Sequence, residues 1–279
     1  MEQQKRNHPL TAKRKQLLEE DAEWIVDEYF EPDELIRPEV IAEAEGFTHS
    51  LSNYNNDFKG LIHYLNGSFH VYLDTTYGTE LSDTVIRYSF AHELGHYFIN
   101  EHRSELLAMG MLGSTNGAAM LSEGLFEKEA EFFASCLLMP RTRFIADIAE
   151  QPFSTWLIHQ LCKKYKVSQT AAFMRYMALG EEQIAVIFIH EDGRFERKMQ
   201  SPHFNHYNLK LDEDGFIPAG SVAGAYCYDG VDVSGEHLLA ADVWFNPKTE
   251  EDALRVYREE CLVQPNLRRI VSVVYEKVV

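Results

Sequence analysis

The sequence lacks any apolar segment long enough to cross a membrane. A membrane-spanning helix needs about 20 consecutive apolar residues, and no stretch of the 279-residue chain approaches that length. The first fifteen residues, MEQQKRNHPLTAKRK, are charged and contain no apolar core of the kind that a secretory signal requires. We therefore expect a cytoplasmic protein that does not contact the membrane.

Cysteine is scarce and widely spaced. Neighbouring cysteines are at least 26 residues apart, so the sequence contains no CxxC pair of the kind found in zinc ribbons and dithiol redox sites. The four are Cys136, Cys162, Cys227 and Cys261. We expect reduced, mainly structural thiols.

Positive charge is in short supply. The chain has 26 Lys and Arg against 44 Asp and Glu, a net charge of −18, whereas proteins that bind nucleic acid generally present a basic face. The charge is uneven: residues 21–150 carry −16, residues 151–180 carry +4 with no acidic residue, and residues 181–279 carry −8. We expect no direct DNA binding, and the basic segment leaves such binding as the lesser alternative.

Helical and strand patterns are mixed in the first part of the chain. The expected helices are residues 11–30, 38–45, 82–102 and 123–139. Two β-rich runs, residues 60–65 and 69–73, are joined by Asn66-Gly67-Ser68, a hairpin signal because Asn and Gly accept positive φ. Residues 104–121 are rich in Gly, Ser, Ala and Met, which predicts a mobile connection.

The later part of the chain changes in character. Residues 154–165 and 168–179 predict a pair of short helices, and short strand patterns dominate afterwards. At roughly 150 residues per domain, the length allows about two domains. We expect an α+β protein with a mainly helical domain and small sheet, a helical connector, and a mixed α/β domain, at residues 1–150, 151–180 and 181–279 respectively.

One short motif carries recognisable chemistry. Residues 91–96 read AHELGH, an HExxH sequence inside a predicted helix. Residues four apart share a helix face, so His92 and His96 can bind one zinc ion while Glu93 lies beside a water molecule and accepts its proton. The alternative is a helix with two exposed or capped histidines. The apolar residues around the motif favour the metal, because unpaired buried histidines would be costly.

A catalytic zinc site requires a third protein ligand. The predicted helix that follows offers Glu127, with Glu131 one turn further along the same face. If Glu127 binds the metal, Glu131 can accept a hydrogen bond from a ligand histidine and fix its tautomer. The alternative is that both are solvated charges. Glu129, about 200° around the helix from Glu127, is expected to be solvated.

These two blocks resemble a known family. The string RYSFAHELGH at residues 87–96 and the string EKEAEFFASCLLMP about thirty residues later resemble the ImmA/IrrE family of metallopeptidases, whose usual patterns are RFTLAHELGH and ExxANxFAxxLLMP. The resemblance implies a zincin-like peptidase domain with one zinc ion, held by His92, His96 and Glu127, and with Glu93 as catalytic base. The family commonly has Asn or Asp where this chain has Glu131.

The resemblance extends along the chain and implies a function. Residues 154–180 are similar to the helix-turn-helix-like segment of longer members, and the last hundred residues are similar in layout to their C-terminal regulatory or sensor-like domain. Members cleave or inactivate helix-turn-helix repressors to switch on stress-response, phage or mobile-element genes. We therefore expect a zinc endopeptidase whose substrate is such a repressor. The alternative is a non-proteolytic regulatory binding protein of a toxin–antitoxin or phage module.

Two further segments carry expectations of their own. Residues 69–74 are a candidate edge strand on which an extended substrate could pair, and an interior strand is the equal alternative. His203 and His206 form an HxxH pattern in a predicted loop, and we expect them to be solvent-exposed polar side chains rather than a second metal site.

Overall fold

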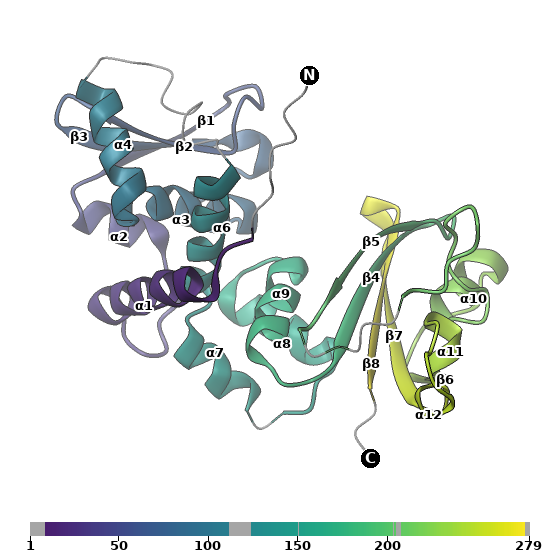
Figure 1. Ribbon diagram of the computed structural model, residues 1–279. Helices are drawn as coiled ribbons and strands as arrows, with labels where there is room; N and C mark the ends of the chain where they lie inside the picture. Colours follow the sequence, from purple (N-terminus) through teal and green to yellow (C-terminus); the bar gives the residue numbers. More distant parts are fainter. Residues whose placement is uncertain (1–8, 112–123, 150, 203, 205–207, 277–279) are drawn as a thin grey trace, which may run out of the picture. The chain divides into compact units, whose positions relative to one another are not determined.

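A computed structural model describes residues 9–111, 124–149, 151–202, 204 and 208–276 (Figure 1). The fold is α+β, as predicted. It divides into two compact units, the first of which comprises Met1–Pro152 with Ile158–Ala172 and the second Phe153–Leu157 with Phe173–Val279. Among the described residues, no helix combines the length and apolarity needed to cross a bilayer.

The first unit combines helices with a small sheet. Its helices are α1 (Ala12–Tyr29), α2 (Pro38–Ala44), α3 (Thr84–Phe98), α4 (Asn100–Met111), α6 (Gly124–Leu138) and α7 (Arg141–Ile148), with a 3-10 turn, η1 (Thr75–Tyr77). Its strands are β1 (Thr48–Ser52), β2 (Gly60–Leu65) and β3 (Ser68–Asp74). The helices α8 (Thr155–Tyr165) and α9 (Gln169–Leu179) occupy the stretch expected to form a connector, and each contributes residues to both units. The three-part domain division stays a prediction.

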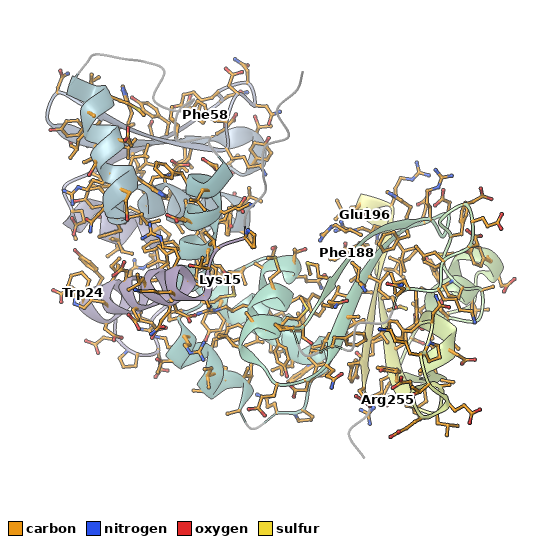
Figure 2. All side chains as sticks on the ribbon, in the orientation of Figure 1. Lys15, Trp24, Phe58, Phe188, Glu196 and Arg255 are labelled. Carbon is orange, nitrogen blue, oxygen red and sulfur yellow. The ribbon has the colours of Figure 1, made fainter. Side chains whose placement is uncertain are left out.

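The first helix begins directly after Thr11, which caps it. The Thr11 side chain accepts a hydrogen bond from the Arg14 backbone N–H at 3.2 Å. It thereby satisfies one of the backbone N–H groups that have no partner within the first turn of the helix. Leu18, Ala22 and Ile25 are buried and recur at helical spacing. Trp24 is 64% exposed and projects from α1 (Figure 2). The buried stripe of α1 packs against α6.

The small sheet has the strand order β1-β3-β2. The predicted hairpin is confirmed, because β2 and β3 pair antiparallel across the turn at Asn66 and Gly67. Of the two alternatives for residues 69–74, the structure has the interior strand, because β1 pairs in parallel along the other side of β3. The polar sequence THSLS gave no strand signal for β1. The edge strand opposite β1 is therefore β2.

The predicted single helix at residues 82–102 is two helices. The first helix, α3, ends at Phe98. The extended backbone of Ile99 (φ −75°, ψ 112°) then turns the chain before α4 begins at Asn100. The mobile connection expected at residues 104–121 is also wrong as far as Met111, since α4 continues to that residue. The remainder of that stretch lies outside the described residues.

Helices α3 and α6 lie close together because Gly95 has no side chain. A Cβ atom there would meet Cα of Ala130 at 3.2 Å and the Phe133 ring at 3.2 Å. Ala130 and Phe133 are fully buried. The glycine of the HELGH string therefore permits the helix approach that brings Glu127 near the two histidines.

The second unit is built on an antiparallel five-stranded sheet. Its order is β5-β4-β8-β7-β6, with strands β4 (Ile184–His190), β5 (Phe195–Gln200), β6 (His237–Ala240), β7 (Val256–Gln264) and β8 (Arg269–Glu276). Short helices α10 (Val222–Asp229), α11 (Ala241–Trp244) and α12 (Glu250–Ala253) and the 3-10 turn η2 (Pro265–Leu267) complete it. Trp244 and Phe204 are buried in the hydrophobic core of this unit with inward residues of β4 and β8. His203 and His206 lie outside the described residues.

Candidate metal centre

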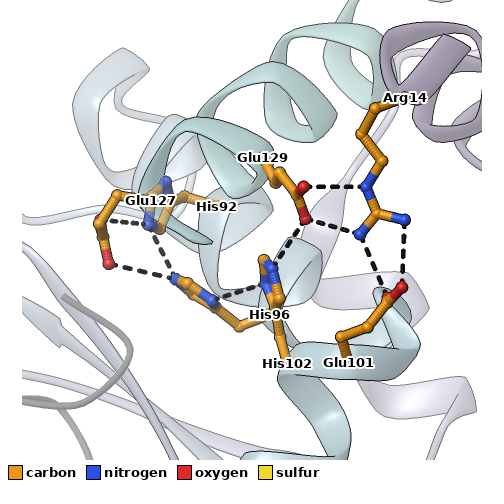
Figure 3. Close-up of polar contacts among 7 residues, drawn as sticks. All are labelled: Arg14, His92, His96, Glu101, His102, Glu127 and Glu129. Carbon is orange, nitrogen blue, oxygen red and sulfur yellow. Dashed lines mark hydrogen bonds and ion pairs between the residues drawn. The ribbon is translucent and has the colours of Figure 1, made fainter. Parts of the chain in front are cut away.

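Three side chains from two helices converge in the first unit. His92 and His96 project from successive turns of α3, and their Nε2 atoms lie 3.2 Å apart. Glu127, in the first turn of α6, places one carboxylate oxygen 3.2 Å from His92 Nε2 and the other 3.6 Å from His96 Nε2 (Figure 3). One ligand atom from each residue lies within 4.8 Å of the others. The structure thus brings together all three residues predicted to hold the metal.

The spacing of these atoms fits zinc. Tetrahedral zinc with ligand distances of about 2.0–2.1 Å separates neighbouring ligand atoms by about 3.3 Å. The two imidazole nitrogens and the Glu127 carboxylate match that separation, and they are the ligand types that zinc prefers. The residues present therefore fit a single zinc ion.

The charges of the cluster favour a metal ligand set. Burial opposes ionisation of Glu127, but hydrogen bonding to His92 and the proximity of the His96 imidazole hold the pKa of its carboxyl well below the usual range. Burial likewise opposes protonation of His92, yet hydrogen bonding to Glu127 and the nearby carboxylates give its pKa a net rise. The lowered pKa of Glu127 favours its ionised form, which is the form of a carboxylate that binds a metal.

Glu93 lies beside this cluster and against the sheet. Its side chain is 6% exposed, and one carboxylate oxygen accepts a hydrogen bond from the backbone N–H of Ile62 in β2 at 2.9 Å. A Cβ atom on Gly60 would lie 2.8 Å from the other oxygen. Burial raises the pKa of Glu93, as suits a group that takes up and releases a proton.

A chain of hydrogen bonds behind His96 was not predicted. His96 Nδ1 lies 3.2 Å from Nδ1 of His102 in α4, and His102 Nε2 lies 3.1 Å from a carboxylate oxygen of Glu129 (Figure 3). Arg14 donates to both Glu129 oxygens, at 2.9 and 2.6 Å, and to Glu101 at 3.3 and 3.1 Å. The expectation that Glu129 is solvated is wrong, because it is 4% exposed.

The reason for that error lies in the packing of α6. The helix is buried on two sides, against α3 and against α1. A residue opposite Glu127 therefore faces protein rather than water. The apolar residues all around α6 were the signal that its far side is also covered, among them Ala130, Ala134, Cys136 and Leu138.

Glu131 lies at the surface of α6. Its contact with α3 is through the backbone, since its carbonyl accepts a hydrogen bond from the Tyr88 hydroxyl at 3.3 Å. Within the described ranges, no hydrogen bond joins its carboxylate to His92 or His96. Its role as a partner of a ligand histidine stays a prediction.

Comparison with known proteins matches the segment that contains this site to a family model. The family model Peptidase_M78, described as the IrrE N-terminal-like domain, matches residues 76–177, a range that contains both histidines, Glu93 and Glu127. No protein among those with curated descriptions matches the sequence.

A solved structure has a similar fold over most of the chain. It is a Mycobacterium tuberculosis transcriptional regulator with a TM-score of 0.55 and 11% identity, and the match covers 94% of this chain and 76% of that one. At this identity the likeness concerns the fold alone. The resemblance seen in the sequence agrees with the family match: residues 76–177 are similar to the IrrE N-terminal-like domain described by the Peptidase_M78 model.

Proposed function

We propose that this chain is a zinc-dependent endopeptidase that cleaves a helix-turn-helix transcriptional repressor and so derepresses stress-response, phage or mobile-element genes. The observation that carries the proposal is the convergence of His92, His96 and Glu127 at zinc-ligand spacing with Glu93 alongside. The match to a peptidase family supports the same chemistry.

The three converging residues would hold the zinc ion. A bound zinc ion polarises a peptide carbonyl and makes water a stronger acid. Two neutral imidazoles and one carboxylate leave the ion with a net positive charge, which that role requires. The buried setting of His96, which is 3% exposed, limits competing water on its side of the site.

Glu93 is placed to move the proton. It follows His92 directly in α3, so its carboxylate lies next to the ligands without being one of them. It accepts a proton from the attacking water and returns it to the leaving amine. The Ile62 N–H holds one carboxylate oxygen and leaves the other available for that transfer.

The edge of the sheet offers a place for an extended substrate. Within the part of the chain that the structure describes, β2 pairs with β3 alone, and its residue Ile62 contacts Glu93. A peptide that paired with this edge would run beside the proposed proton acceptor. This assigns to β2 the role that was expected of residues 69–74.

The negative charge of residues 21–150 favours a positively charged protein as the partner. Residues 21–150 carry −16, which attracts the positive surface of a DNA-binding protein and repels DNA itself. Screening at physiological salt, with a Debye length of about 8 Å, limits the effect to the rate of encounter. A helix-turn-helix repressor meets this charge requirement.

The test uses the full chain, zinc, and a purified helix-turn-helix regulator, and a regulator of this kind found beside the gene would be the first candidate. Mass spectrometry should show a cut regulator with the wild-type protein. With Glu93→Gln the rate should fall by about 100-fold to 10,000-fold, and zinc binding should persist. Glu105→Gln, at an exposed position of α4, is the matched control and should cleave normally.

Two outcomes would contradict the proposal. An intact regulator that binds the protein tightly would replace catalysis with sequestration, the alternative function. Equal cleavage by Glu93→Gln would remove Glu93 from the chemistry.

A further inference from the structure

A buried line of polar side chains runs away from the metal centre through His102. Its imidazole is 0% exposed and bridges His96 and Glu129, while Glu129 is itself held by Arg14. His102 does not belong to the group of residues that could hold the metal. Its contacts with His96 and Glu129 therefore need a different explanation.

The donors and acceptors of this line can be ordered in one direction. Arg14 donates to both oxygens of Glu129, so Glu129 is an ionised carboxylate that only accepts. The hydrogen between Glu129 and His102 must then lie on His102 Nε2. A neutral imidazole with its hydrogen on Nε2 has a bare Nδ1, which accepts.

The same logic fixes the hydrogen on His96. Since His102 Nδ1 accepts, the hydrogen bond of 3.2 Å between the two rings places a hydrogen on His96 Nδ1. His96 Nε2 is then bare and faces His92 and Glu127. A bare Nε2 is the form of histidine that binds a metal.

We infer that His102 is a positioning residue that fixes the tautomer and ring orientation of His96, with Glu129 and Arg14 holding His102 in place. This rests on the zinc site of the proposed function. The inferred role belongs to His102 and Glu129.

The local fold holds His102 in a defined orientation. The chain turns at Ile99, so α4 carries His102 back toward His96 rather than onward along one helix. The ring of Phe126 stacks on the His102 ring with centroids 4.1 Å apart and planes 26° apart. Packing and hydrogen bonds therefore fix both the position and the rotation of this imidazole.

Two substitutions at the same position separate hydrogen bonding from packing. His102→Phe keeps a planar ring for the stack on Phe126 and removes both hydrogen bonds. His102→Gln replaces the ring by an amide, whose oxygen can accept from His96 and whose NH2 can donate to Glu129. His159→Phe, at an exposed position of α8, is the matched control.

Zinc affinity is the first measurement, by competition of each full-length protein with a chromophoric chelator. Loss of a hydrogen-bond partner of a ligand histidine lowers metal affinity by about 10-fold to 100-fold. His102→Phe should show that loss, whereas His102→Gln should recover most of the affinity and His159→Phe should match the wild type. Thermal unfolding of the zinc-free proteins establishes that each variant is folded.

The tautomer itself is the second measurement, by nitrogen-15 NMR of the His96 ring in the zinc-free protein. The wild type and His102→Gln should carry the hydrogen on Nδ1. In His102→Phe, the loss of the acceptor should move it to Nε2, where the Glu127 carboxylate can accept it. The wild-type spectrum tests the inference even if a variant does not fold.

The outcomes distinguish this inference from the proposed function. Zinc binding by His102→Phe as tight as that of the wild type would overturn the inference and leave the peptidase proposal standing. A hydrogen on Nε2 of His96 in the wild type would overturn it as well. An affinity of His102→Gln as low as that of His102→Phe would show that restoring the two hydrogen bonds does not restore zinc binding, and would overturn the inference. A wild-type protein that binds no zinc would instead contradict the proposed function.

Discussion

Arg14 and Glu129 lie 115 residues apart in the sequence and form a bidentate ion pair, with nitrogen–oxygen distances of 2.9 and 2.6 Å. Arg14 lies in the first turn of α1 and Glu129 in α6. The pair therefore joins the first helix of the chain to the helix that carries Glu127. Because Glu129 is buried, its charge depends on the partners that α1 and α4 supply.

The first prediction concerns that ion pair. Arg14→Met keeps a long apolar stem but removes both hydrogen bonds to Glu129. We expect the free energy of unfolding to fall by about 1–3 kcal/mol, since a buried carboxylate loses its cationic partner while His102 remains. Arg37→Met breaks an exposed pair with Glu34 and should change stability by about 0–1 kcal/mol. Urea unfolding measures both, and equal effects would show that the Arg14 pair is no stronger than a surface pair.

The second prediction concerns Gly60. A methyl group there would lie 2.8 Å from a carboxylate oxygen of Glu93, so Gly60→Ala must displace that carboxylate. We expect cleavage to slow by about 100-fold, the effect of misplacing a catalytic group by about 1 Å. Zinc affinity should be unchanged because Glu93 is not a proposed ligand.

Gly124→Ala is the control for that experiment. Among the described residues, nothing lies within 4 Å of a Cβ atom at Gly124, so this substitution should leave cleavage unchanged. Normal activity of Gly60→Ala would show that Glu93 either shifts without penalty or does not act in the reaction.

The third prediction concerns a buried carboxylate of the second unit. Glu259 is 0% exposed and accepts hydrogen bonds from several converging donors. They are the backbone N–H groups of Val222 and Ala223, Trp244 Nε1, Ser272 Oγ and Cys261 Sγ. In Glu259→Gln an NH2 group would face donors, and we expect a loss of about 1–3 kcal/mol in the free energy of unfolding.

The control for that substitution is Glu236→Gln. Glu236 pairs with Arg258 at the surface, so its replacement should cost about 0–1 kcal/mol in denaturant unfolding. Zinc affinity should not respond to either change, since the metal-site residues all belong to the first unit. Equal destabilisation by the two substitutions would show that the Glu259 network contributes nothing beyond a surface contact.

The fourth prediction concerns pH and Asp74. Burial opposes ionisation of Asp74, but the backbone N–H groups of Thr76 and Asn56, each at 2.8 Å, outweigh it and lower its pKa. A pKa that is lower in the folded state stabilises the fold above the unfolded value of about 3.9, and this stabilisation is lost as the pH falls through the folded value.

Comparison of the wild type with Asp74→Asn tests the direction of this pH dependence of stability. We expect the wild type to be the more stable protein at pH 7 and the difference to shrink as the pH approaches 3. Urea unfolding of the zinc-free proteins across this range measures it and avoids loss of metal at low pH. A difference that stays constant or grows on acidification would contradict the assignment.

The residues of the candidate metal centre were predictable because their spacing is local. His92, Glu93 and His96 lie within five residues of one helix, and a helix fixes which of their side chains share a face. Glu127 was found through the pattern of a single later helix. Such features need only helical periodicity, which the sequence displays directly.

The residues behind the site were not predictable in the same way. Glu129 was expected to be solvated because helical geometry alone places it opposite Glu127, and only the tertiary contact with α1 makes that side an interior. His102 was expected near the end of one long helix, yet the turn at Ile99 sets its direction. The polar strand β1 was missed because its burial comes from pairing with β3.

The contacts of the site also determine the shortest segment of the chain that can be transferred to another gene with the site intact. The stretch by which the family is recognised begins at residue 76, but Glu93 is held by Ile62 and Glu129 by Arg14. A gene segment transferred without its first 75 codons would encode the HExxH motif and Glu127 but leave one carboxylate misplaced and another without its cation. Recombination that preserves function must therefore carry the first helix and the small sheet along with the motif.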